Sequence, residues 1–261
     1  MDSTPFFTRD GDRYQPTTAS RGPWDPKSLH GRVVIGLLGA AIEQRHGAPQ
    51  YIPARLTVDM YRLPGLDPIE VTTRAIRDGY RIKVIEAELF SAGVSMARAS
   101  CQLLRRGEPP AGNVWSPPNW SVPAPDTASE ADPAMALGGM WKVRPIVGAM
   151  GDIGPRRLWM AEVRDLVDGE RLTPFVRVAL ASDFASPYAN AGDRMLHYIN
   201  SDVTLYLHRT PVSEWIGFEV VNHQASEGVA IGECWLYDET GAIGTATVAA
   251  LARAGMGLPG Q

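Results

Sequence analysis

The sequence is poor in cysteine and has no excess of basic residues, and both absences narrow the class of protein. Only two of its 261 residues are cysteine, which excludes a disulfide framework, and the spacing typical of a zinc site does not occur. The formal net charge is -4, so the chain has no bulk electrostatic attraction for nucleic acid or for an anionic membrane. The sequence therefore predicts no nucleic-acid partner and no metal site.

Long hydrophobic runs are also missing. The longest apolar stretch is about a dozen residues, whereas a membrane-spanning helix needs about 20. The first residues, Met1–Pro5, have neither the basic region nor the apolar region of a secretory signal. We therefore expect a cytoplasmic protein without a membrane span.

The common signatures of catalysis are absent as well. The chain has no G-x-S-x-G nucleophile elbow and neither of the glycine-rich loops that hold phosphates. Its five histidines include no pair at the i, i+4 spacing of a metal site. We expect no cofactor, so any chemistry must use water, a carboxylate and backbone dipoles.

What the sequence does contain is an internal duplication. The segment 56–64 (LTVDMYRLP) reappears as 203–211 (VTLYLHRTP), 147 positions later. Asp78-Gly79 corresponds to Glu227-Gly228, and segment 93–99 corresponds to 241–247, at shifts of 149 and 148. A repeat of this length indicates two fused copies of one domain. Because Tyr61-Arg62 recurs as His208-Arg209, we expect this pair to be structural in both halves.

Local patterns divide the chain into five parts. We assign residues 1–28 to an N-terminal leader, 29–106 to a first unit, 107–139 to a proline-rich linker, 140–255 to a second unit and 256–261 to a tail.

Each unit is predicted to hold one helix and an antiparallel meander. In the first unit a helix capped by Ser28 should run to about residue 44, apolar on every side and therefore buried. The predicted strands of this unit are 54–63, 69–77, 80–90 and 94–104. In the second unit we expect strands at 140–147 and 157–163, a helix from Thr173-Pro174 to about 184, and strands at 201–209, 214–224, 228–238 and 242–253. The segment 186–200 leaves room for a short helical turn.

Motifs in this order resemble a known family. Segment 29–34 (LHGRVV) is similar to the F-G-G-Q-V-V that opens the first helix of double-hotdog acyl-CoA thioesterases of the bacterial thioesterase II type. The resemblance continues through segments 77–79 (RDG), 141–145 (WKVRP), 181–184 (ASDF), 207–209 (LHR) and 214–215 (EW). It covers nearly the whole chain.

The resemblance implies an α+β fold, a double hotdog in which two antiparallel sheets, joined edge to edge, each wrap a long helix. It also implies a thioesterase that hydrolyses an acyl-CoA or acyl-carrier thioester by direct attack of water, without metal. We expect a homo-oligomer.

The family's site residues map onto this chain one by one. In the family an Asp on the second helix, a Ser or Thr before the following strand and a Gln on the last strand position the hydrolytic water. The Asp corresponds to Asp183, the Ser or Thr to Asn200, and the Gln to Ala249, which offers no polar group. Without the resemblance, the favoured interpretation of Asp183 is a simple ion pair with Arg177 or Arg194.

The second candidate group is His30, Gly31 and Arg32 at the start of the first helix. Free backbone N–H groups there could polarise the thioester carbonyl as an oxyanion hole, although capping and packing would explain the same residues. The resemblance implies that this group lies within about 12 Å of Asp183, the range that a bridging water allows. We expect a mostly apolar pocket between them.

Two other functions remain open at this point. The Gln that Ala249 replaces makes a non-catalytic acyl-CoA or lipid-binding protein the main alternative. A hotdog lyase of the enoyl-CoA hydratase type is a distant third, because the residues after Asp183 lack the Asn and His of its D-x-N-P-x-H motif.

Overall fold

The computed structural model describes residues 4–23, 25–118, 120–129 and 140–252. The first half contains β1 (Phe7–Asp10), β2 (Arg13–Pro16), a 3-10 turn (Thr18–Ser20), α1 (Gly31–His46), β3 (Tyr51–Met60), β4 (Ile69–Asp78), β5 (Ile82–Ser91) and β6 (Val94–Arg105). A further 3-10 turn, Pro125–Thr127, lies in the linker.

The second half begins with β7 (Trp141–Val147), β8 (Arg157–Glu162), α2 (Pro174–Ser182) and α3 (Ala185–Asn190). It continues with β9 (Ala191–Gly192), β10 (Met195–Leu196), β11 (Tyr198–Asn200), β12 (Asp202–Leu207), β13 (Ile216–Ser226), β14 (Val229–Asp238) and β15 (Gly241–Ala252). The four predicted strands of each meander are confirmed within a few residues of their predicted ends.

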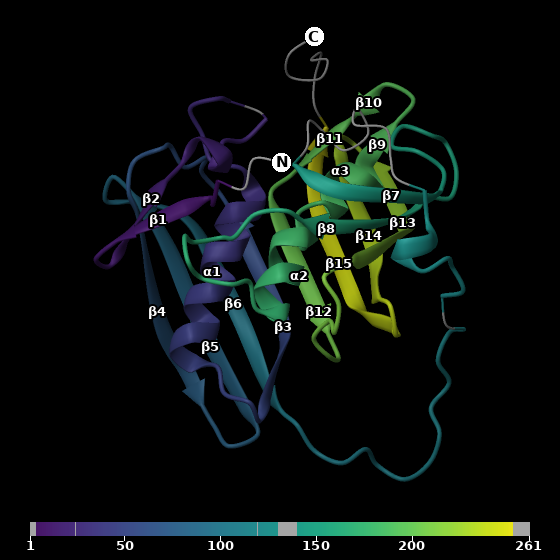
Figure 1. The fold of residues 1–261 in the computed structure, drawn as a ribbon, viewed down its shortest axis with the longest axis horizontal. Helices are drawn as coiled ribbons and strands as arrows, with labels where there is room; N and C mark the ends of the chain where they lie inside the picture. Colours follow the sequence, from purple (N-terminus) through teal and green to yellow (C-terminus); the bar gives the residue numbers. More distant parts are fainter. Residues whose placement is uncertain (1–3, 24, 119, 130–139, 253–261) are drawn as a thin grey trace.

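One large antiparallel sheet runs through both halves. Its strand order is β1-β2-β4-β5-β6-β3-β12-β15-β14-β13-β8-β7, and β11 also pairs with β15. Read outward from the centre, the two halves have the same order, because β3-β6-β5-β4 corresponds to β12-β15-β14-β13. Figure 1 shows α1 lying against one half of this sheet and α2 and α3 against the other. The expected α+β double hotdog is confirmed.

The two units join at the centre of the sheet, where Thr57 on β3 pairs with Thr204 on β12. These residues are themselves repeat equivalents, 147 positions apart, and their hydroxyls are 3.2 Å from each other. A residue that pairs with its own equivalent marks a pseudo-twofold axis. This axis runs through the edge-to-edge junction and relates the two units.

The same symmetry includes the N-terminal segment. Strands β1 and β2 extend the sheet beyond β4, just as β7 and β8 extend it beyond β13. Phe6 and Phe7 are fully buried in the core. Residues of the predicted leader thus take part in the sheet, while the predicted tail, 256–261, lies outside the described residues.

The first helix starts later than predicted. Its N-cap is His30, whose Nδ1 accepts a hydrogen bond from the backbone N–H of Arg32 at 3.2 Å. The hydroxyl of Ser28 instead donates to the carbonyl of Asp25. The predicted burial is confirmed, since every residue from Arg32 to Ile42 is buried. The two glycines of this helix, Gly36 and Gly39, allow α2 to approach closely along Leu180 and Ala179.

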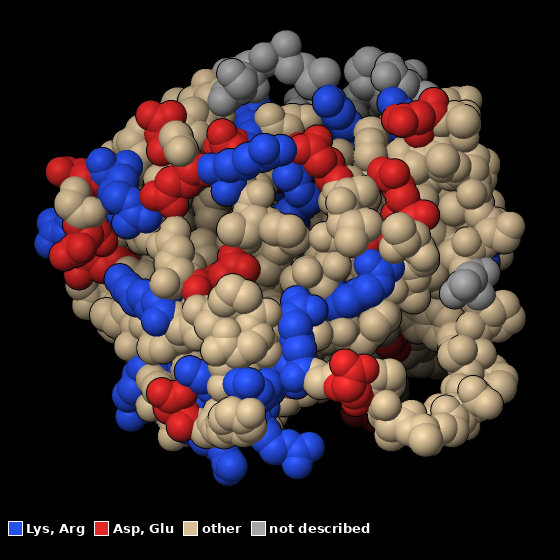
Figure 2. Space-filling view, turned by 60° about the horizontal axis from the view of Figure 1, so that its bottom comes forward, with Lys and Arg blue, Asp and Glu red and all other residues tan. Residues whose placement is uncertain are grey.

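The exposed charges on the surface are mixed in sign. Figure 2 shows Lys and Arg interspersed with Asp and Glu across one face of the molecule. Several of them pair, for example Arg74 with Glu86 at 2.7 Å and Arg9 with Glu170 at 2.7 Å. In the described part of the chain no helix is long and apolar enough to cross a membrane.

Candidate active site between the two units

The beginning of α1 and the end of α2 meet in one place. An ideal Cβ built on Gly31 would lie 2.9 Å from Oδ1 and 3.1 Å from Oδ2 of Asp183. Nδ1 of His30 is 3.2 Å from Oδ2 of the same carboxylate. The structure therefore brings His30 and Gly31 of one unit into contact with Asp183 of the other, well inside the predicted limit.

Local sequence explains how Asp183 comes to face α1. The N-cap of α2 is Thr173, whose hydroxyl accepts from the N–H of Val176, and Pro174 is the first residue of the helix. Asp183 is its C-cap, and the chain turns there directly into α3. The residue is only 7% exposed. Its alternative partner Arg177 pairs instead with Glu214 at 3.5 Å.

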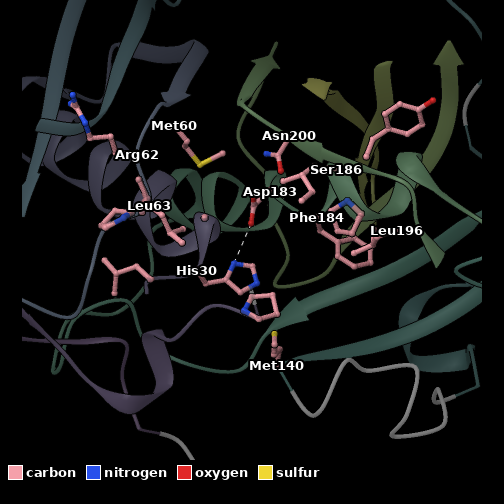
Figure 3. A pocket seen from close by; sticks show the side chains of 18 of the residues that line it. His30, Met60, Arg62, Leu63, Met140, Asp183, Phe184, Ser186, Leu196 and Asn200 are labelled. Carbon is pink, nitrogen blue, oxygen red and sulfur yellow. Dashed lines mark ion pairs between the residues drawn. The ribbon is translucent and has the colours of Figure 1, made fainter. Parts of the chain in front are cut away.

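A cavity of about 290 Å³ opens beside this contact. Its walls come from α1, the end of β3, the region after α2 and β11. Figure 3 shows His30 and Asp183 pointing toward each other, with Asn200 and Ser186 on the Asp183 side. Most lining residues are apolar, among them Leu29, Val34, Met60, Leu63, Trp141, Phe184 and Leu196. The expected apolar pocket between the two candidate groups is present.

Only part of the predicted backbone group is available to a ligand. The N–H of Arg32 is bonded to His30, and the Arg32 side chain, 3% exposed, does not line the cavity. Its guanidinium pairs with Glu162 at 2.9 Å and lies over the rings of Phe6 and Trp141. Burial lowers the pKa of Arg32 and raises that of Glu162, and their mutual attraction opposes both shifts. Arg32 thus holds the helix start against β8.

The backbone N–H of Gly31, by contrast, has no acceptor among the described residues. It belongs to the first turn of α1, where the helix leaves its N–H groups unpaired. Gly31 also lines the cavity. This is the amide that could donate to a ligand oxygen.

Polar groups near Asp183 include one that sequence reasoning missed. Asn200 lines the cavity, and its Nδ2 donates to the carbonyl of Asp202 at 3.2 Å. Ser186 also lines the cavity, and its N–H donates to the carbonyl of Asp183. The signal was available, because a residue three positions after Asp183 falls on the same side if the helix continues.

Ala249 is not part of the site. It alternates with the buried Val248 and Ala250 along β15, so it points to the opposite face of the sheet. Its N–H donates to Oδ1 of Asp202 at 2.7 Å. Asn200 pairs across the strands with Ala250 and so shares a face with that residue. The assignment of the family's Gln position to Ala249 therefore does not correspond to a cavity position.

The arginines of the two repeated pairs, Arg62 and Arg209, have different hydrogen-bond partners. Arg209 binds Asp238 through two guanidinium nitrogens, as expected for a structural residue. The equivalent Arg62 has no such partner; it donates to the carbonyl of Ser95 and lines the cavity. Both arginines thus bond within their own unit, as a structural role requires, but Arg62 has only a carbonyl as its partner and also lines the cavity.

A second cavity, of about 280 Å³, lies at the other end of the helix pair. There Glu43, near the end of α1, contacts Thr173, the N-cap of α2, as Asp183 contacts the N-cap His30 at the first end. The Thr173 hydroxyl donates to Glu43 at 2.5 Å, and burial raises the pKa of Glu43. The first residue of α2 is Pro174, which has no N–H, so this end lacks the amide that Gly31 offers.

No three His, Cys, Asp or Glu side chains gather into a possible metal cluster within the described ranges. The predictions that the protein needs no metal and no cofactor stay predictions.

Comparison with known proteins identifies the family. Residues 20–105 match the acyl-CoA thioesterase N-terminal domain, and residues 118–251 match the acyl-CoA thioesterase C-terminal domain. No curated protein matches the chain.

Solved structures similar to this chain share the fold at low sequence identity. The tesB protein of Mycobacterium avium subsp. paratuberculosis is 14% identical, with a TM-score of 0.69, 95% of this chain covered and 96% of that one. A thioesterase of Novosphingobium aromaticivorans, described as putative, is 18% identical, with a TM-score of 0.71 over 96% and 100% of the two chains. A hot dog protein of unknown function from Alicyclobacillus acidocaldarius is 16% identical, with a TM-score of 0.74 over 96% of each chain. Because the two domain matches follow each other along the sequence and together span most of it, the chain belongs to the acyl-CoA thioesterase family.

Proposed function

We propose that this chain hydrolyses acyl-CoA thioesters at the cavity between its two units, with Asp183 as the group that positions and deprotonates the attacking water. The observation that carries the proposal is the contact of Asp183 with Gly31 and His30 across the unit boundary. A carboxylate and an unpaired helix N–H on facing sides of one apolar cavity are what this reaction needs.

Each of the two units would supply one of the groups that the reaction needs. The Gly31 N–H would donate to the thioester oxygen as negative charge develops on it, an effect worth about 10²–10³ in rate for one such donor. Asp183 would accept a proton from the water that attacks the carbonyl carbon. The amide of Asn200 and the hydroxyl of Ser186 are the neighbouring groups that could hold this water, in place of the family's Ser or Thr and Gln.

The two parts of the substrate would contact different residues. Apolar side chains such as Val34, Met60 and Phe184 suit the acyl chain, because burial of apolar surface stabilises it there. Arg62 is the one Lys or Arg among the described lining residues. Its guanidinium would attract the phosphates of CoA.

The test is CoA release from a panel of acyl-CoA substrates, measured together with equilibrium binding. We expect saturable turnover, and in ¹⁸O water the product acid should take up one ¹⁸O in a single turnover, because water attacks the carbonyl directly. Saturable binding without CoA release would overturn the proposal in favour of a non-catalytic binding protein. Product acid formed without ¹⁸O in the first turnover would contradict direct attack by water.

A further inference from the structure

His30 makes two contacts through a single nitrogen. Its Nδ1 is 3.2 Å from the backbone N of Arg32 and also 3.2 Å from Oδ2 of Asp183. An imidazole nitrogen in one protonation state can accept a hydrogen bond or donate one, but not both. If Nδ1 only accepts from Arg32, its lone pair faces a carboxylate oxygen, and that contact is repulsive. The approach of Nδ1 to Asp183 is favourable when a proton lies between the two atoms.

The surroundings keep this pair away from bulk water. The side chains of His30 and Asp183 are 12% and 10% exposed. The His30 ring makes an edge-to-face contact with Trp141, with centroids 5.9 Å apart and planes at 88°. The charged groups nearby are Arg32 on α1 and Glu162 on β8, which pair with each other. Tyr61 at the end of β3 and Tyr198 on β11 line the same cavity.

The other ring nitrogen of His30 remains available. Nε2 has no hydrogen-bond partner among the described residues, while the residue lines the cavity. A proton bound at Nδ1 by Asp183 therefore belongs to a ring whose second nitrogen can reach a ligand. This arrangement connects the carboxylate of one unit with a potential proton donor of the other.

We propose that His30 is the catalytic acid of the reaction and forms a proton-sharing dyad with Asp183. This inference rests on the proposed thioester hydrolysis. Asp183 removes a proton from water as the water oxygen bonds to the carbonyl carbon. The C–S bond then breaks, its electron pair goes to sulfur, and the thiolate takes the proton from Nε2 of the His30 imidazolium. His30 is then neutral and keeps the Nδ1 proton that faces Asp183 across 3.2 Å. Asp183 releases the proton of the attacking water to solvent and Nε2 takes one up from solvent, so each turnover delivers one proton to the thiol and restores the starting charges.

The test compares two leaving groups. A CoA thiolate benefits from protonation because an unactivated alkyl thiol is at least as weak an acid as the cysteine thiol, whose pKa is about 8.5. A nitrothiophenyl ester of the same acyl group releases a far more acidic thiol, which needs no proton to leave. His30→Ser is the variant of choice, because Ser keeps the N-cap of α1 but does not reach Asp183 or the sulfur.

We expect His30→Ser to lower kcat for acyl-CoA by about 10²-fold, the usual size of general acid catalysis, and to lower it much less for the nitrothiophenyl ester. Equal losses on both substrates would overturn the role of acid, and unchanged kcat on acyl-CoA would overturn the dyad as a whole. Asp183→Asn, which should abolish hydrolysis of both substrates, separates this inference from the proposed function. Wild-type kcat on acyl-CoA in His30→Ser, together with an inactive Asp183→Asn protein, would overturn only the dyad and leave the proposed function in place. Unfolding curves for each variant show that the fold is retained.

Discussion

Gly31 lies so close to Asp183 that a methyl group in place of its hydrogen would sit 2.9 Å from the carboxylate oxygen Oδ1. Real Cβ atoms do not approach an oxygen this closely, so a side chain at this position would force the Asp183 carboxylate to move. The contact joins the start of one unit's helix to the end of the other's. It explains why the cavity cannot form within either unit alone.

Gly31→Ala should therefore damage catalysis more than stability. The added methyl group displaces the carboxylate from its place beside the cavity, and a displacement of about 1 Å can cost about 10²-fold in rate. We expect kcat on acyl-CoA to fall by about that factor. Steady-state kinetics together with thermal unfolding measure both effects.

Gly39→Ala is the matched control in the same helix. A Cβ on Gly39 would be 3.4 Å from Cβ of Ala179, which is ordinary contact. Alanine is also a better helix former than glycine by about 1 kcal/mol. The Gly39 variant should keep its activity and its stability, and an equal loss of kcat in the two variants would disprove the specific role of Gly31.

Arg62 should affect substrate binding through charge. Replacing it with Ala removes the cationic side chain from the cavity wall, and an exposed ion pair is worth about 0.2–1 kcal/mol. We expect KM for acyl-CoA to rise about 2–5-fold, and the difference from the wild type should shrink at high salt because ions screen exposed charges. A KM effect of the same size on a substrate without phosphates would contradict the assignment.

Ala249→Gln should not increase turnover. Residue 249 faces away from the cavity, on the side of β15 opposite Val248 and Ala250. A glutamine there would lie on the outer face of the sheet. A large gain in kcat would show that this position reaches the site after all.

Ala249 shows that a sequence pattern can predict a strand without predicting which face of the sheet each of its residues occupies. The order of the motifs and the repeat predicts the fold, because strands, turns and a buried helix each have a local signature. The face of a strand is different, because a shift of one residue in the alignment moves a side chain to the other side of the sheet. The site residues that come from helix ends, Gly31 and Asp183, do not depend on such a register.

Contacts between residues that are far apart in the sequence also cannot be predicted from local sequence patterns. The expected cap Ser28 is a good capping residue by type, but Nδ1 of His30 takes the position two residues later. The contact of Glu43 with Thr173 beside the second cavity joins residues 130 positions apart, so no local pattern predicts it. The different roles of Arg62 and Arg209 depend on a single acid, Asp238, which is 29 positions from Arg209.

Asp238 should make the protein sensitive to acid. Burial alone would raise the pKa of Asp238, but hydrogen bonds from Arg209, Val212 and Thr240 outweigh burial and hold the pKa well below its ordinary value. A lowered pKa in the folded state stabilises the protein above the pKa of the unfolded chain, about 4. This stabilisation is lost as the pH falls below that value.

Asp238→Asn removes the charge and most of this pH dependence. We expect the free energy of unfolding at neutral pH to fall by about 1.5–3 kcal/mol, the size of a hydrogen bond to a charged group. The gap between variant and wild type should narrow below about pH 4. Denaturant titrations across this range provide the measurement, and a gap that stays constant with pH would rule out the carboxylate as the cause.

The central claim is that hydrolysis depends on Asp183, the acid at one end of the helix pair, and not on Glu43 at the other end. Asp183→Asn and Glu43→Gln each remove one carboxylate that lies beside a helix N-cap, and only Asp183 lies beside a first helical residue that has an N–H, because α2 begins with Pro174. The direct measurement is kcat for CoA release by the two variants under identical conditions. We predict that Asp183→Asn lowers kcat by at least about 10²-fold while acyl-CoA binding persists, and that Glu43→Gln keeps the wild-type rate. Wild-type turnover by Asp183→Asn, or an equal loss in Glu43→Gln, would contradict the account.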